Sequence, residues 1–183
     1  MILINEATNK LILSRYILAA LRTESPRVIG IASAFVTTSG IDTLATVLSE
    51  TGVEECFLIA GTDNDISHPA ALAKAMELGW RLRLATSRQG IFHPKLMVAG
   101  RSIDTTGLIR EPKVVYAGSA NLTHNGLTRN LECGSVQVGI HCHDSASTAF
   151  RTLWQKSVDA TDELIRNYSA RFAETSRCRS AVE

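Results

Sequence analysis

The residues with the clearest chemical potential in this sequence are the histidine and the lysine of Phe92-His93-Pro94-Lys95. They stand two apart in an apolar run that predicts a strand, and residues at that spacing project from the same face of a strand. An imidazole can transfer protons near neutral pH or attack phosphorus as a nucleophile, and an ammonium attracts a phosphate oxygen. The pair therefore indicates a phosphate-ester site, although His-x-Lys also occurs by chance.

A second polar group, Gly118-Ser119-Ala120-Asn121, directly follows a run of apolar residues. A glycine there permits a tight turn with exposed backbone N–H groups, which together with the Ser119 hydroxyl and the Asn121 amide would bind an anion. The alternative is an ordinary turn in which Ser119 and Asn121 bond their own backbone. A triad of Ser119, His93 and an acid is disfavoured, because no Gly-x-Ser-x-Gly elbow surrounds the serine.

Glu132 begins the next strand-like segment, in Asn130-Leu131-Glu132-Cys133. A carboxylate bonded to one ring nitrogen of a catalytic histidine fixes the tautomer of the ring and stabilises its cation. Glu132 is thus a candidate to orient a histidine, and the alternative is a solvated charge at the end of a strand.

Two further histidine groups are weaker candidates. His124 lies close behind Asn121 and is either a substrate contact or a loop residue. His141-Cys142-His143 places two imidazoles on one face of a strand, but a structural zinc site needs about four ligands and no second pair is apparent. The sequence therefore predicts no metal site.

Length and composition limit the classes of protein that remain. With 183 residues, 45% of them hydrophobic and 20% charged, the chain is typical of one folded domain spanning residues 1–183. The formal net charge of +1 gives no global attraction to a polyanion. No apolar run is long enough to span a bilayer, no signal peptide is evident, and the four cysteines form no CxxC pair. These features predict a cytoplasmic protein without a membrane partner.

Hydrophobic periodicity predicts an α/β fold. Helices and strands alternate in the first half of the chain, which predicts parallel strands joined by crossover helices. The expected helices cover residues 11–21, 41–48 and 69–78, and the expected strands cover 28–35, 55–60 and 80–85. Beyond these come strands at 92–98 and 113–117, which are expected to form a hairpin across a long polar loop at 100–112. A further strand at 135–141 and one or two helices within 145–172 follow. The predicted fold has a mixed, mostly parallel central sheet with helices on both faces.

Taken in order, Phe-His-Pro-Lys, Gly-Ser-Ala-Asn-Leu-Thr-x-x-Gly-Leu and Asn-x-Glu resemble the motifs of the phospholipase D superfamily. The likeness is greatest to the single-motif (HKD-type) nuclease branch, which includes restriction-endonuclease catalytic domains and nuclease-like domains attached to helicases. It extends to residues 31–35 and to Gly61-Thr62-Asp63, so that it covers residues 28–140.

This resemblance implies a phospholipase D-like fold and a role for each motif residue. His93 would be the nucleophile that forms a phosphohistidine. Lys95 and Asn121 would hold the phosphate, with Ser119 assisting there, and Glu132 would orient a histidine.

One position departs from the family pattern. Gly100 stands where the full motif has an aspartate, five residues after the lysine, and Asp104 further along the loop is not equivalent to it. Because the nuclease branch often lacks that aspartate, the departure argues against a lipid enzyme more than against catalysis.

The implied mechanism needs a second imidazole, because one attacks phosphorus while another protonates the leaving oxygen. A homodimer with the site on its two-fold axis would supply it, and no metal or cofactor is then required. The implied partner is nucleic acid, with DNA favoured over RNA, and target choice would belong to a separate specificity or helicase component. The alternatives are a non-catalytic or weakly catalytic nucleic-acid-binding module of a restriction or defence system, and a phospholipase.

Overall fold

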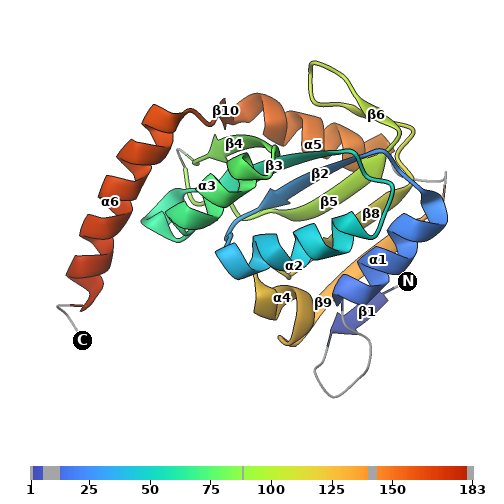
Figure 1. Ribbon diagram of the computed structural model, residues 1–183, viewed down its shortest axis with the longest axis horizontal. Helices are drawn as coiled ribbons and strands as arrows, with labels where there is room; N and C mark the ends of the chain where they lie inside the picture. The colour runs from blue at the N-terminus through green and yellow to red at the C-terminus, as the bar shows by residue number, and fades with distance from the viewer. Residues whose placement is uncertain (1, 6–12, 88, 140–143, 181–183) are drawn as a thin grey trace.

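The computed structural model describes residues 2–5, 13–87, 89–139 and 144–180, which build an eight-stranded sheet with helices on both faces (Figure 1). The strand order is β1-β9-β8-β5-β2-β3-β4-β10. These strands are β1 (Ile2–Asn5), β2 (Val28–Ser33), β3 (Glu55–Gly61), β4 (Arg81–Ala85), β5 (Lys95–Gly100), β8 (Val114–Gly118), β9 (Glu132–Val138) and β10 (Val158–Asp159), and a separate hairpin contains β6 (Ser102–Ile103) and β7 (Ile109–Arg110).

The pairing of the strands corrects one part of the predicted fold class. Within the described residues, β2 with β3 and β3 with β4 pair in parallel, whereas the other five pairs of neighbours are antiparallel. The α/β class and the mixed sheet are confirmed, but the expectation of a mostly parallel sheet is wrong. The described connections between β5, β8 and β9 contain no helix longer than five residues, and without a crossover helix successive strands return antiparallel.

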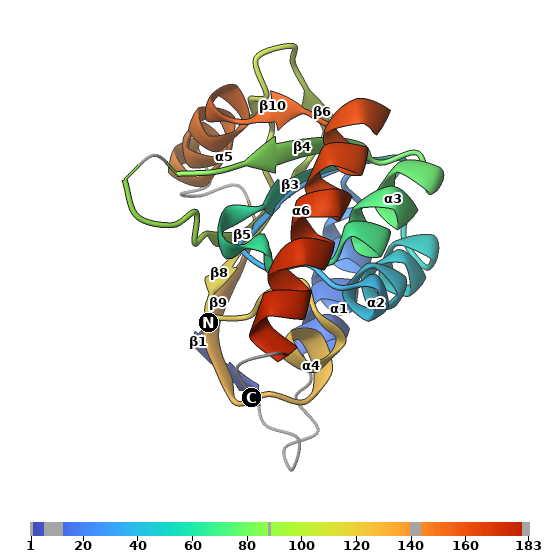
Figure 2. The same ribbon diagram turned by 90° about the vertical axis from the view of Figure 1, so that its left-hand side faces the viewer.

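The helices lie on both faces of the sheet, as predicted (Figure 2). One face carries α1 (Leu13–Glu24), α2 (Thr38–Ser49), α3 (Pro69–Glu77) and the short α4 (His124–Thr128), and the other carries α5 (Asp144–Lys156). The last helix, α6 (Asp162–Ser180), runs beside α3 and a 3-10 turn, η1 (Asp63–Asp65). Among the described residues, none of these helices has the length and apolar character needed to cross a membrane.

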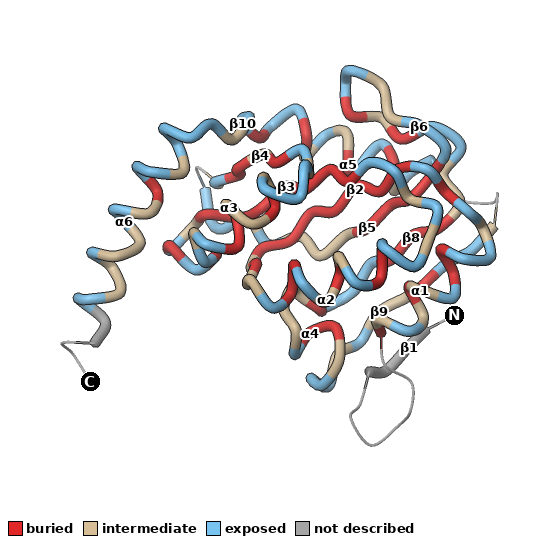
Figure 3. Tube along the Cα trace, viewed as in Figure 1, coloured by how far each residue is buried: buried red, intermediate tan, exposed pale blue. Residues whose placement is uncertain are grey.

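The central strands β2 and β3 are buried along almost their whole length (Figure 3). Ile29 and Ile31 of β2 pack in the core beneath α1 and α2, whereas Ala32 belongs to the core under α5. Gly30 faces the same way as Ala32, and a Cβ at this position would lie 2.6 Å from the ring of Phe150 in α5. The near-continuous apolar run in β2 therefore reflects a strand covered on both faces.

Two edge strands, the short strands β6 and β7 within the predicted loop 100–112, and one helix were not predicted. β1 and β10 have four and two residues, and α4 has five. Segments this short carry too few residues to show a period.

The register of the strands gathers the candidate site residues at one edge of the sheet. Ser33, the last residue of β2, pairs with Lys95, the first residue of β5. Gly118 at the end of β8 pairs with Gly134 near the start of β9. This edge therefore joins the carboxyl ends of β2 and β8 to the amino ends of β5 and β9, and the polar segments that follow or precede them meet there.

Candidate active site

His93 and Lys95 are in contact, although not as members of one strand. β5 begins at Lys95, so His93 lies in the preceding loop and the predicted strand start at residue 92 is wrong. The Nζ atom of Lys95 lies 2.8 Å from Nε2 and 3.0 Å from Nδ1 of His93. The ring of His93 is exposed and Lys95 is partly buried. An anion held by the ammonium would therefore lie within reach of the imidazole.

The loop that carries His93 is held by Asp63, which follows β3. The Asp63 carboxylate accepts hydrogen bonds from the backbone N–H of Phe92, at 2.5 Å, and from that of Ser87, at 3.1 Å. On the other side of His93, the carbonyl of Pro94 accepts a hydrogen bond from the backbone N–H of Ala34 at 2.9 Å. The backbone on both sides of the histidine is thus anchored to the strand ends.

The segment Gly118–Asn121 differs from its predicted role. The backbone N–H of Ser119 donates to the carbonyl of Cys133 at 2.9 Å, and that of Ala120 donates to the Tyr116 hydroxyl at 3.0 Å. These donors are used within the protein, so the predicted anion site of exposed backbone N–H groups is wrong for both residues. The side chains of Ser119 and Asn121 are what this segment can offer to a ligand.

Gly118 does not form the predicted tight turn. Its lack of a side chain instead leaves space for Tyr116. It is the last residue of β8, and a Cβ there would lie 2.5 Å from the Tyr116 hydroxyl and 2.6 Å from the Cys133 carbonyl. Gly134 on β9 is equally close to the tyrosine ring, at 2.6 Å. Burial raises the pKa of the Tyr116 hydroxyl, which keeps it neutral and able to accept the hydrogen bond of Ala120. Tyr116 positions the backbone of Ala120. The sequence did not indicate this role, because Tyr116 lies within an apolar run.

Glu132 connects Ser119 to the lysine. Its carboxylate accepts hydrogen bonds from the hydroxyl of Ser119 and, at 3.1 Å, from the side-chain amide of Asn130. Burial lowers the pKa of Lys95, and the Glu132 carboxylate raises it in part. Between the described side chains of Glu132 and His93 there is no hydrogen bond, so within one chain the carboxylate supports Ser119 and Lys95 rather than the histidine. Nor does Ser119 bond His93, which leaves the triad alternative without geometric support.

Asn121 lies between two hollows. It lines a cavity of about 30 Å³ together with Lys95, and it lines a larger pocket together with His124 and Glu132. Its side-chain oxygen is buried and has no hydrogen-bond partner among the described residues. A buried polar atom without a partner costs about 1–3 kcal/mol. This oxygen can accept a hydrogen bond from a bound group, whereas the NH2 of the same amide can donate one to a phosphate oxygen.

His124 is held at the start of α4 by α2. Its Nδ1 lies 3.0 Å from the hydroxyl oxygen of Thr43, and that hydroxyl is 2.7 Å from the carbonyl of Ser39. A threonine hydroxyl has one hydrogen. Both contacts are satisfied when Thr43 donates to Ser39 and His124 donates from Nδ1 to Thr43. Nε2 of the neutral ring is then left as an acceptor.

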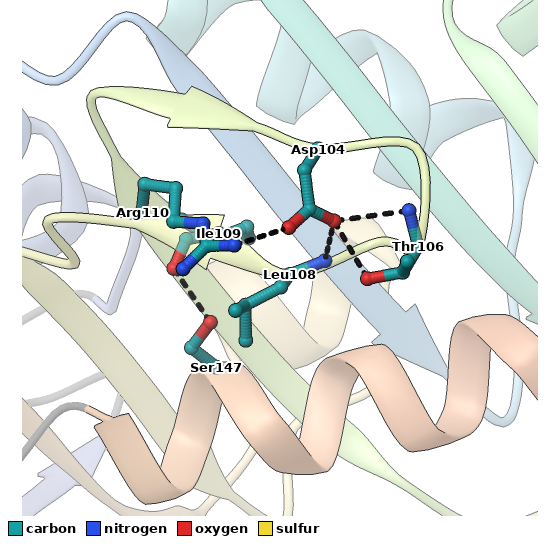
Figure 4. Close-up of polar contacts among 6 residues, drawn as sticks. All are labelled: Asp104, Thr106, Leu108, Ile109, Arg110 and Ser147. Atoms are coloured by element: carbon teal, nitrogen blue, oxygen red, sulfur yellow. Dashed lines mark hydrogen bonds and ion pairs between the residues drawn. The ribbon is translucent and has the colours of Figure 1, made fainter.

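Asp104 has a structural role in the hairpin of β6 and β7 (Figure 4). Its carboxylate accepts hydrogen bonds from the backbone and hydroxyl of Thr106, from the backbone of Leu108 and from the guanidinium of Arg110. These bonds, led by the Thr106 hydroxyl, lower its pKa to about 2. Gly100 ends β5 at the edge opposite to its first residue, and a Cβ there would lie 2.6 Å from the carbonyl of Arg110. The hairpin packing therefore excludes a motif aspartate at this position.

The zinc alternative at His141-Cys142-His143 lies outside the described residues. Within the ranges that the structure describes, no group of three or more histidine, cysteine, aspartate or glutamate side chains is placed to hold a metal ion.

The sequence over residues 2–154 matches the family model described as "Cardiolipin synthase, PLD-like domain". Because this match covers most of the chain, the protein belongs to the phospholipase D-like family, and the predicted membership is confirmed. Membership supports a phosphodiesterase-type enzyme. In a separate search of curated proteins, no sequence matched significantly.

Several solved structures share the fold. Nuc from Salmonella typhimurium, a phospholipase D family member, is 17% identical with a TM-score of 0.58, and the alignment covers 88% of this chain and 99% of Nuc. NucT from Helicobacter pylori is 15% identical with a TM-score of 0.58, over 87% of this chain and 98% of NucT. Phosphatidylserine synthase from Haemophilus influenzae Rd KW20 is 12% identical with a TM-score of 0.54, over 98% of this chain but 45% of the synthase. At these identities the matches establish the phospholipase D-like fold alone.

Proposed function

We propose that the chain is a metal-independent nuclease whose single catalytic domain spans residues 1–183. The observation that carries this proposal is the contact between the Lys95 ammonium and the His93 ring, at an edge where Ser119, Asn121 and Glu132 also lie. Family membership supports phosphodiester chemistry. The fold is shared over almost the full length of Nuc and NucT, each about the size of this chain.

The proposed reaction has two steps. A ring nitrogen of His93 attacks phosphorus and forms a P–N bond, while the bond to the leaving oxygen breaks and a second imidazole protonates that oxygen. The second imidazole then takes a proton from water, the water oxygen bonds to phosphorus, and the P–N bond breaks. Lys95 and the Asn121 amide stabilise the charge on the non-bridging oxygens in both steps.

The second imidazole belongs to His93 of another copy of the chain in this proposal. Two observations support a site shared by two subunits. The His93 ring is exposed. Within the described part of one chain, Glu132 makes no hydrogen bond to His93. In a two-fold arrangement Glu132, which also accepts hydrogen bonds from Ser119 and Asn130, would orient the histidine of the other subunit.

The proposed substrate is nucleic acid, with DNA favoured over RNA. The segment from residue 91 to residue 143 holds five lysines and arginines against three acids, an excess that suits a phosphate backbone. The pocket beside Asn121 is lined mainly by polar side chains, which argues against the lipid-binding alternative. Choice of target would come from a separate specificity or helicase component.

Cleavage in the presence of EDTA tests the proposal. We expect the wild-type protein to cut an oligonucleotide in EDTA and the His93→Ala variant to lose this activity. His68→Ala is a matched control, because His68 caps α3 and lies outside the site. Activity that disappears with the chelator, or that survives His93→Ala, would contradict the mechanism.

A non-catalytic nucleic-acid-binding module is the second candidate. The observation that favours it is Gly100, which leaves the chain without the aspartate of the full motif. This alternative predicts binding that weakens with salt, with a slope that reports the number of phosphates contacted, and no turnover by the wild-type protein.

A further inference from the structure

A polar pocket adjoins the proposed catalytic group on the side of α2 and α4. Its volume is about 390 Å³, within the range typical of sites for small ligands. Asn121 and Glu132 form part of its wall, so whatever occupies the pocket lies next to the reacting phosphate. The remaining lining residues are Phe35, Thr37, Ser39, Thr123, His124, Asn125 and Asn130.

The charge of the lining argues against a second phosphate in this pocket. None of the described lining residues is a lysine or an arginine, and one of them, Glu132, is a carboxylate. Phosphate groups on proteins are held mainly by cations and by backbone N–H groups. A neutral group with hydrogen-bonding edges fits the lining better.

The side chains of the pocket match the features by which proteins hold an unstacked base. Phe35 supplies an aromatic ring, and Asn125 and Asn130 supply amides that both donate and accept hydrogen bonds. Base recognition in single strands combines stacking on an aromatic ring with hydrogen bonds to the base edges. In the tautomer of His124 that donates from Nδ1 to Thr43, Nε2 is an acceptor that faces no other described hydrogen-bond partner.

The backbone that presents Phe35 is held on both sides. The carbonyl of Phe35 accepts a hydrogen bond from the Ser33 hydroxyl at 2.9 Å, and the next N–H, that of Val36, donates to the buried hydroxyl of Ser67 at 3.2 Å. Ser33 Oγ also accepts from the N–H of Leu122 at 2.9 Å, directly after Asn121. The Ser33 hydroxyl thus links the backbone of Phe35 to the backbone directly after Asn121.

We propose that this pocket binds the base of the nucleotide next to the scissile phosphate, with Phe35 as its stacking surface. The inference rests on the proposed nuclease function and adds the substrate class. A base inside a duplex is stacked and paired, so it cannot enter a pocket without being flipped out. The preferred substrate is therefore single-stranded or locally unpaired nucleic acid.

The test compares two single-stranded oligomers of equal length, one with bases and one of abasic deoxyribose phosphate units. We expect kcat/KM to be about tenfold or more higher for the oligomer with bases, and higher for single strands than for the duplex. In Phe35→Leu the ratio between the two oligomers should fall towards one, and Phe35→Tyr should restore it. Equal rates for both oligomers with the wild-type protein, or an unchanged ratio in Phe35→Leu, would overturn the proposal.

Binding of the same oligomers separates this inference from the nuclease proposal. Fluorescence anisotropy measured without turnover should show tighter binding of the oligomer with bases, by a similar factor, and the preference should be lost in Phe35→Leu. If no oligomer is cleaved but this preference is present, the nuclease proposal fails and the base pocket stands. If both oligomers are cleaved and bound alike, the base pocket fails and the nuclease proposal stands.

Discussion

At the scale of single residues, Lys95 is the side chain on which most of the candidate chemistry depends. It touches the His93 ring and lines a cavity with Asn121. Burial lowers its pKa, and Glu132 opposes that effect. In the proposed mechanism the ammonium must remain charged to hold a phosphate, and Glu132, which raises the pKa of Lys95, would favour that charge.

The pH dependence of activity should report this coupling. Because burial lowers the pKa of Lys95 below its ordinary value of 10.5, we expect kcat/KM to decline on the alkaline side before a free lysine would lose its proton. Glu132→Gln removes the charge that raises this pKa, so the alkaline decline should move to lower pH, in addition to any loss of rate. Glu111→Gln, at an exposed position directly after β7 where the carboxylate pairs with Arg101, should leave the profile unchanged. An alkaline limb that does not move in Glu132→Gln would show that Lys95 does not set it.

Asp104 provides a prediction about stability rather than activity. Its pKa lies at about 2 in the folded protein, below the ordinary value of 3.8. A depressed carboxylate pKa stabilises the fold above the unfolded-state pKa, and this contribution is lost as the pH falls through the folded-state pKa. Asp104→Asn should therefore lower the melting temperature at pH 7, and the difference from wild type should shrink between about pH 4 and pH 2. Nuclease activity at pH 7 and a permissive temperature should be retained, and its loss would place Asp104 in the site.

At the scale of elements, the loops around the sheet edge decide how the site is built. His93, Lys95, Ser119, Asn121 and Glu132 are the candidates that the sequence offers, because their residue types and order resemble the family pattern, and the structure places them at one edge of the sheet. The hydrogen bonds that hold the backbone around these residues were not predicted. The bonds to Asp63 and Tyr116 join residues from different strands, and such contacts depend on the sheet order, which a linear pattern does not specify.

Asp63→Ala should show how strongly the loop before β5 controls catalysis. Without the carboxylate, the N–H groups of Ser87 and Phe92 lose their shared acceptor. A displacement of about 1 Å can reduce the rate about a hundredfold, so we expect kcat to fall at least tenfold while binding of an oligonucleotide changes little. Asp42→Ala, which removes a surface ion pair with Lys74, is the matched control. An Asp63→Ala protein with wild-type kcat would show that His93 is positioned by other contacts.

At the scale of the whole molecule, the sequence predicted the helices and strands of the first half well and the sheet less well. Residues 28–33 and 55–61 form strands close to their predicted bounds, since central strands covered on both faces are continuously apolar. The hairpin of β5 and β8 was predicted, and its antiparallel pairing is confirmed. The antiparallel contact of β5 with β2 and the edge strands β1 and β10 were not predicted, because pairing partners follow from tertiary packing.

The proposed two-subunit site predicts that activity depends on concentration. Sedimentation at micromolar concentration should show a homodimer, and specific activity should fall when the protein is diluted below the dissociation constant of the dimer. A strict monomer that retains its full specific activity would leave the site with one His93 and would contradict a shared site.

The most direct measurement is a search for the covalent intermediate. A labelled single-stranded oligonucleotide is mixed with excess enzyme in EDTA, the reaction is stopped with alkali and detergent, which preserve a phosphohistidine, and the modified peptide is identified by mass spectrometry. We expect a transient protein–oligonucleotide adduct on His93 that is absent in His93→Ala. Cleavage without an adduct in the wild-type protein, or an adduct on Ser119, would contradict His93 as the nucleophile.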